Sequence, residues 1–117
     1  MEDAEQWRRR QRAATLEGDA AQALHVAERL ELLADEVERR LEPITTEMTP
    51  ATWAGQAADE ARREAYVAAD DLATAARDLR AVAGEARAEA TAWQAQAVLL
   101  RVATEAAPRV DGPQVPA

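Results

Sequence analysis

The sequence of 117 residues has no cysteine, no phenylalanine and a single histidine, His25. Without cysteine it can form neither a disulfide framework nor a thiolate zinc site, and it offers no thiol nucleophile. One histidine cannot supply the paired ligands of a di-iron helical bundle or of a His-Glu-x-x-His metalloprotease. Glycine-rich phosphate-binding loops are missing as well. We therefore expect no metal site and no cofactor.

Long apolar runs are also missing from the sequence. No run approaches the roughly 18 residues that a membrane-spanning helix requires, so we expect no transmembrane segment. The basic residues Arg8–Arg10 are not followed by a hydrophobic stretch, so neither a Sec nor a twin-arginine signal is recognisable. The chain is therefore expected to be cytoplasmic, or secreted by a route that needs no cleaved signal peptide.

Bulky apolar residues are scarce, although 48% of the residues are hydrophobic. Alanine supplies 31 of them, whereas leucine, isoleucine and valine together number 19. Such a composition with a net charge of −8 is typical of disorder unless the apolar residues recur with a regular period. Four glycines, five prolines and abundant Ala, Glu, Arg and Leu favour long helices in at most one domain.

All 14 basic residues are arginine, and they are unevenly distributed. Residues 1–17 hold four acidic and four basic residues, so the net charge of −8 lies in residues 18–117. An acidic body repels phosphate backbones, which predicts no nucleic-acid partner. The patch Trp7–Arg12 could touch phosphate or a membrane surface, but acidic residues at its flanks favour a solvated helical segment.

Apolar residues first recur regularly in the N-terminal half, at alternating spacings of four and three. This heptad pattern predicts an amphipathic helix, preceded by an N-terminal helical extension at 1–17. Pro43 disfavours helical backbone at Glu42, so the helix should end near Leu41 and be followed by a turn at about 42–52. The predicted seam comprises Leu16, Ala20, Ala23, Ala27, Leu30, Ala34, Val37, Leu41, Ile44 and Met48.

A second helix is predicted from Pro50 to Ala107, with Thr49 as its N-cap and Pro50 in its first turn. The pattern later falls on Glu89 and Gln96, which indicates a stutter. We expect residues 108–117 to be a disordered tail. The predicted seam comprises Ala54, Ala58, Ala61, Ala65, Ala68, Leu72, Ala75, Leu79, Val82 and Ala86, with Ala90, Trp93, Ala97 and Leu100 taking over.

The pattern as a whole predicts an all-α helix-turn-helix hairpin over residues 18–107. If its bend is centred near residue 50, Trp7 and Trp93 should meet at the open end. An isolated hairpin with an alanine seam buries too little apolar surface to offset its chain entropy. We therefore expect a four-helix bundle formed by dimerisation. The expected dimer interface comprises Leu30, Leu33, Val37, Leu41, Leu72, Leu79 and Val82.

The short motif Trp53-Ala54-Gly55 lies where the chain leaves the predicted turn. Alone, Trp-x-Gly is a weak signal, and a tryptophan there could simply close the end of a bundle. At the single bend of a cysteine-free, all-helical chain of about 100 residues, the motif gives a stronger resemblance. With the segment 53–62 and the later leucines Leu72 and Leu79, the chain resembles the WxG-motif family of small type VII (ESX) secretion substrates over about residues 18–92.

The resemblance implies a non-enzymatic hairpin that is exported folded, as a homodimer or as a heterodimer with a related hairpin. It also implies a type VII secretion ATPase as a further partner. Of the family's composite secretion signal, Trp53 and Gly55 carry over by position. The Tyr-x-x-x-Asp/Glu motif of the tail does not, because Tyr66 and Asp70 lie early in the second helix and simply share one helix face. Either a partner carries that signal or the protein stays inside the cell.

Two other classes of function are compatible with a helical hairpin. The alternative to secretion is a cytosolic coiled-coil scaffold or regulatory subunit in which Trp-x-Gly is coincidental. A helical-bundle enzyme is disfavoured, because the predicted seams contain almost no titratable group and so offer no buried pair for acid–base chemistry.

Overall fold

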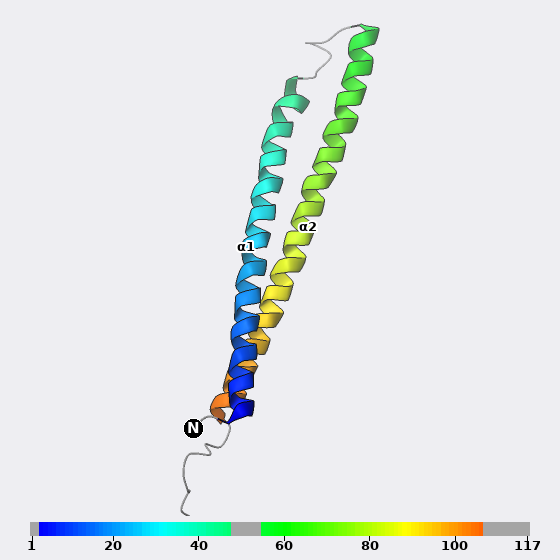
Figure 1. Ribbon diagram of the computed structural model, residues 1–117. Helices are drawn as coiled ribbons and strands as arrows, with labels where there is room; N and C mark the ends of the chain where they lie inside the picture. The colour runs from blue at the N-terminus through cyan, green and yellow to red at the C-terminus, as the bar shows by residue number, and fades with distance from the viewer. Residues whose placement is uncertain (1–2, 48–54, 107–117) are drawn as a thin grey trace, which may run out of the picture. The chain divides into compact units, whose positions relative to one another are not determined.

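The computed structural model describes residues 3–47 and 55–106, which form two α-helices (Figure 1). Helix α1 spans Ala4–Glu47 and helix α2 spans Gln56–Ala106. The chain divides into two compact units: unit 1 combines residues 1–25 with 86–117, and unit 2 comprises residues 26–85. In each unit a segment of α1 packs against a segment of α2. The predicted all-α class and the pairing of two long helices are thus confirmed.

Helix α1 begins with a side-chain cap at Asp3. The Asp3 carboxylate accepts a hydrogen bond from the backbone N–H of Gln6 at 2.8 Å, and its carbonyl accepts one from Trp7 at 3.1 Å. This cap satisfies an N–H group that the first helical turn would otherwise leave unpaired. From there α1 continues without a break through residue 17 into the predicted heptad region.

The end of α1 differs from the prediction. The helix includes Pro43 and continues to Glu47, so residues 42–47 of the predicted turn are helical. Proline removes one backbone hydrogen bond, a local loss that does not end this helix. The Thr45 and Thr46 hydroxyls donate to the Glu42 carbonyl at 3.0 and 2.8 Å, so both side chains bond back onto the helix backbone.

The start of α2 also differs from the prediction, and Gly55 explains why. Gly55 has a φ of +107°, which is not helical, so no continuous helix can begin at Pro50. The Gly55 carbonyl accepts the N–H of Asp59 at 2.9 Å, which makes Gly55 the N-cap residue. The predicted cap Thr49–Pro50 and the tail at 108–117 lie outside the described residues.

A row of small buried side chains runs along each helix at intervals of seven residues, and we call these the seam rows. Alanine dominates both rows, so the two backbones can approach closely. No seam-row residue is more than 8% exposed. The rows are Ala13, Ala20, Ala27, Ala34 and Leu41 on α1, and Ala69, Ala76, Ala83, Ala90, Ala97 and Thr104 on α2.

The predicted seam of α1 is confirmed from Leu16 to Leu41, where every member is buried or half-buried. Ile44 is 40% exposed, and Met48 lies outside the described residues. Part of the predicted seam of α2 is displaced by one residue from the row that is buried. Ala68, Ala75 and Val82, which were expected to be buried, are exposed.

Their C-terminal neighbours are buried instead, and the buried row continues at the same interval through Ala90 and Ala97. The predicted stutter is therefore absent. Adjacent alanines at 68–69 and 75–76 fit both registers equally well, so the sequence did not distinguish them.

The predicted contact between Trp7 and Trp93 is also wrong. In unit 1, Glu17 on α1 forms an ion pair with Arg101 on α2, which fixes the local register. Trp7 lies ten residues before Glu17, so its antiparallel counterpart would lie ten residues beyond Arg101, past the end of α2. Trp7 is 56% exposed, whereas Trp93 packs with the buried cluster that contains Leu16.

Neither α1 nor α2, over the ranges given above, contains an apolar stretch long enough to cross a membrane.

Two glycines in α2 and at its start should respond oppositely to substitution. Gly55→Ala forces a positive φ on a residue with a Cβ, so the free energy of unfolding should fall by about 1 kcal/mol or more. Gly84→Ala is the matched control, because its site inside α2 has no neighbouring atom within 4 Å of an added Cβ. That substitution should stabilise the protein by about 0.5–1 kcal/mol through helix propensity.

Urea denaturation followed by circular dichroism at one fixed protein concentration measures both changes. An equal gain for the two variants would contradict the assignment of Gly55 as the positive-φ cap of α2.

Candidate interaction surface

The two sides of the seam rows in unit 2 carry different chemistry. Residues four positions after a seam-row residue are polar or charged at several levels, as at Glu38 and Arg80. Residues three positions after one are leucine or valine at several levels, as at Val37 and Leu79. On a helix these two positions lie on opposite sides of the residue they follow. We call the two sides of unit 2 the charged side and the apolar face.

An ion pair between the helices shows which positions share a side. In unit 2, Arg80 Nη2 donates to Asp35 Oδ1 at 2.7 Å and to Glu38 Oε2 at 3.0 Å, and Arg80 Nη1 donates to Glu38 Oε1. Because Glu38 and Arg80 each lie four positions after a seam-row residue, those positions of α1 and α2 face the same way. The positions three residues after a seam-row residue therefore share the opposite side, which is the apolar face.

The ion pair of Arg80 with Asp35 and Glu38 changes pKa values on the charged side. The hydrogen bond from Arg80 lowers the pKa of the Glu38 carboxyl, and the bonds to Glu38 and Asp35 raise the pKa of Arg80. In unit 1 the hydrogen bond from Arg101 likewise lowers the pKa of Glu17. The paired side chains are partly exposed, so these contacts fix helix register more than they add stability.

A hollow of about 460 Å³ lies on the charged side of unit 2. Tyr66 and Asp70, expected to share one helix face, both line it. No group of three His, Asp or Glu side chains within residues 3–47 and 55–106 is placed to hold a metal ion. The hollow is lined by Glu38, Leu41, Glu42, Thr45, Tyr66, Ala69, Asp70 and Ala73.

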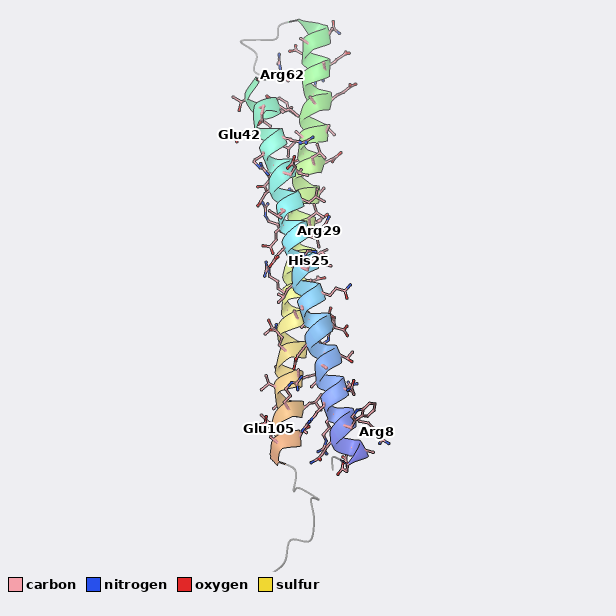
Figure 2. All side chains as sticks on the ribbon, turned by 60° about the vertical axis from the view of Figure 1, so that its left-hand side comes forward. Arg8, His25, Arg29, Glu42, Arg62 and Glu105 are labelled. Carbon is pink, nitrogen blue, oxygen red and sulfur yellow. The ribbon has the colours of Figure 1, made fainter. Side chains whose placement is uncertain are left out.

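The apolar face extends over both helices of unit 2, whose side chains are drawn in Figure 2, and Arg40 interrupts it on α1, seven residues after Leu33. Leu33 and Val82 are 50% and 51% exposed, and Leu72 is 46% exposed. No described residue of unit 2 covers them fully, so this face leaves large aliphatic side chains in contact with water. The apolar face comprises Val26, Leu30, Leu33, Val37 and Ile44 on α1, and Ala68, Leu72, Ala75, Leu79 and Val82 on α2.

All but one of the residues expected in a dimer interface lie on this face. Leu30, Val37 and Leu79 are half-buried at its inner edge, and Leu33, Leu72 and Val82 are exposed. Leu41 does not belong to the apolar face. It is 8% exposed in the seam row of α1, where the chain's own helices already bury it.

Of the two residues that define the Trp-x-Gly motif, the structure describes Gly55. Gly55 is exposed and adopts its positive φ immediately before α2. Trp53 lies outside the described residues. Gly55 thus immediately precedes α2, whereas the sequence predicted that this helix begins at Pro50.

The two units also differ in charge. Residues 26–85 contain 14 acidic residues and seven arginines, which gives unit 2 a net charge of −7 out of −8 for the whole chain. The apolar face is therefore set in a strongly acidic surface.

Comparison of the chain with protein-family models, with curated proteins and with solved structures gives no match. Its function is therefore argued from the surface itself.

The ion pair at Glu38 predicts a specific pH dependence of stability. Because the folded-state pKa of Glu38 is lowered, its contribution is present above the unfolded pKa of about 4.3 and is lost as the pH falls through the folded value. Glu38→Gln should therefore have a lower melting temperature than wild type at pH 7, and this difference should close as the pH falls below about 4.

Glu28→Gln is the matched control, since Glu28 forms no ion pair with any described residue. It should show no such pH-dependent difference. Thermal melts by circular dichroism between pH 7 and pH 3 measure both variants, and a difference for Glu38→Gln that persists at pH 3 would contradict the ion-pair origin.

Proposed function

We propose that this chain acts by binding, and that its apolar face docks on another helical hairpin to form a four-helix bundle. The observation that carries this proposal is the group of exposed and half-buried leucine and valine side chains on one side of unit 2. Fully burying such a side chain contributes about 1.5–3 kcal/mol relative to leaving it exposed. A substantial part of that free energy is still available to a partner at each of these positions.

The interior of the helix pair supports the same proposal. Among the described residues, no large side chain is less than 2% exposed, and the residues with 0% exposure are alanines. Alanine burial releases little free energy, whereas ordering each residue costs about 1–2 kcal/mol of backbone entropy. A partner on the apolar face supplies the burial that the seam rows lack.

The resemblance to the WxG-motif family gives this pairing a biological setting. We propose that the chain is a substrate or escort of a type VII (ESX) secretion system, secreted without a cleaved signal peptide. Its partner is itself or a related WxG-like hairpin, and a type VII secretion ATPase reads the corner formed by Trp53 and Gly55. The positive φ of Gly55 supports a defined change of chain direction immediately before α2.

Catalysis is no part of the proposal. Among the described residues, clear pKa shifts belong to Glu17, Glu38, Arg80 and Arg101, which form the inter-helix ion pairs. These groups are paired at the surface, and none of them lies in a buried cleft that would suit acid–base chemistry.

A cytosolic scaffold or regulatory subunit is the second candidate function. The sequence observation that favours it is the lack of any tyrosine after Tyr66, which leaves the tail without the family's Tyr-x-x-x-Asp/Glu motif. Pairing through the apolar face is common to both candidates, and export separates them.

Two adjacent leucines on α1 provide a matched test of pairing. Leu33→Glu places a carboxylate on the apolar face and should weaken pairing at least about 100-fold, because burying an unpaired charge costs several kcal/mol. Leu32→Glu is the control, since Leu32 is 64% exposed and lies outside the apolar face. Light scattering on the purified protein, alone and after co-expression with a related hairpin, measures both variants, and circular dichroism checks that helicity is retained.

Equal affinity for the two variants would contradict a role for the apolar face.

The secretion proposal is tested separately at Trp53. In a bacterial host with a type VII system, Trp53→Ala should abolish export into the medium while helicity is retained. Trp7→Ala is the control, because Trp7 is an exposed tryptophan in unit 1 and should leave export unchanged. Export of the Trp53→Ala protein at the wild-type level would reject the role of the motif and favour the scaffold.

A further inference from the structure

We infer that the partner of the apolar face carries a row of lysine or arginine residues, at intervals of seven, along the helix that lies beside α2. The inference rests on the proposed function and adds the chemistry by which the partner is chosen. Two features of unit 2 lead to it. One is a row of carboxylates at one edge of the apolar face, and the other is a hollow that two of these carboxylates line.

The outer edge of the apolar face on α2 carries a row of carboxylates, which we call the acidic edge. Its first three members each lie four residues before an apolar-face residue of α2, and therefore beside that residue on the helix surface. Successive members are seven residues apart, which is about 10 Å along a helix. All four are exposed. The acidic edge comprises Glu64, Asp71, Asp78 and Glu85.

The chain's own arginines do not neutralise the acidic edge. None of its four carboxylates forms an ion pair with a described residue. No arginine lies three or four residues away from any of them, the spacings at which side chains on one helix meet. The adjacent arginines have other contacts: Arg77 donates to the Thr74 hydroxyl at 3.1 Å, and Arg63 Nε donates to the Asp59 carbonyl at 3.5 Å. The negative charge of this edge therefore remains available to a partner.

A hollow of about 350 Å³ lies on the acidic edge, and its first two carboxylates both line it. The apolar part of the lining is Val67, which is 63% exposed, and Ala68 of the apolar face. A lysine or arginine side chain combines the two matching properties, because its methylene groups can cover the apolar lining while its charged head bonds a carboxylate. The hollow is lined by Arg63, Glu64, Val67, Ala68 and Asp71.

The α1 side of the same face has a different balance of charge. Over the apolar face and its outer edge, α1 of unit 2 carries two arginines and two glutamates: Arg29, Arg40, Glu36 and Glu47. Glu36 is already paired within the chain, since its carboxylate accepts a hydrogen bond from Arg40 Nε at 3.0 Å. A second copy of this chain thus offers either an acidic row or a balanced one, and neither matches the acidic edge. A different chain with a basic row does.

Charges at the edge of an interface act mainly on the rate of association and on the choice of partner. The spacing of about 10 Å along the acidic edge is close to the Debye length at physiological salt. Each carboxylate is therefore neutralised chiefly by its own counterpart, and a partner with basic residues at the same interval satisfies all four. The aliphatic side chains supply affinity for any helical partner, and the acidic edge selects a basic one.

A charge-reversed copy of this chain is a probe for such a row. Arginine replaces its four acidic-edge residues, which gives α2 a basic row at the matching interval and keeps helix propensity high. Wild-type protein labelled at its amino terminus is titrated with the probe, and fluorescence anisotropy gives the dissociation constant. The probe should bind wild type at least about 10-fold more tightly than wild type binds itself. The substitutions are Glu64→Arg, Asp71→Arg, Asp78→Arg and Glu85→Arg.

A second charge-reversed copy is the matched control, because it has the same net charge as the probe. Its four substituted carboxylates are exposed, lie outside the apolar face and the acidic edge, and form no ion pair with a described residue. It should bind wild type at least about 10-fold more weakly than the probe does. Circular dichroism checks that both copies are helical. The control substitutions are Glu28→Arg, Glu42→Arg, Glu60→Arg and Asp70→Arg.

Salt provides a second measurement on the same samples. The preference for the probe over the control should shrink between about 0.1 M and about 1 M sodium chloride, because the Debye length falls from about 10 Å to about 3 Å. A preference that salt leaves unchanged would contradict an electrostatic origin.

The remaining results separate this inference from the proposed function. Equal binding of the probe and the control, no binding of either, or tighter binding of wild type to itself than to the probe overturns the basic row. In each of these cases, binding of a related hairpin that Leu33→Glu abolishes would still support the proposed function. Conversely, tight binding of the probe that Leu33→Glu leaves unchanged supports the acidic edge and contradicts docking through the apolar face.

Discussion

Alanine at most of the seam-row positions of both helices is the constraint on which the rest of the structure depends. Alanines with almost no exposed surface form most of the contact between α1 and α2. Where alanines lie in the seam rows, the close contact between backbones leaves little room for larger side chains, so most of these lie at the flanks. Leu41, near the end of α1, is the exception. The helix pair consequently has a narrow interior, and its larger aliphatic side chains stay partly exposed to water.

The two sides of the helix contact in unit 2 carry different kinds of side chain. On one side of unit 2, Arg80 spans from α2 to Asp35 and Glu38 on α1, which fixes the register of a seam that alanines alone would leave poorly specified. On the other side Leu33, Val82 and their neighbours form the apolar face. If the ion pairs and the leucines shared one side, a partner that covered the leucines would also bury the charged groups, which costs free energy.

The sequence predicted the buried seams correctly where large residues mark one phase of the heptad, and incorrectly where neighbouring residues fit two phases. The seam of α1 was predictable because leucines at 16, 30 and 41 mark one phase of the heptad. The seam of α2 was wrong by one residue where neighbouring alanines allow two phases, and the apolar residues assigned to it form the apolar face instead. The prediction misplaced the end of α1, which continues past Pro43, and the start of α2, which follows Gly55. Backbone conformation near a helix terminus depends on local hydrogen bonds that residue spacing does not reveal.

Burial and charge act on different properties of the proposed pairing. Aliphatic layers supply free energy, but they discriminate poorly among orientations, because leucine and valine contact one another in many geometries. The net charge of unit 2 discriminates more strongly, since carboxylates placed opposite carboxylates repel one another. The same net charge of −7 in unit 2 repels other acidic surfaces from the apolar face before pairing. Acidity that opposes non-specific association thus also restricts which partners can pair with this face.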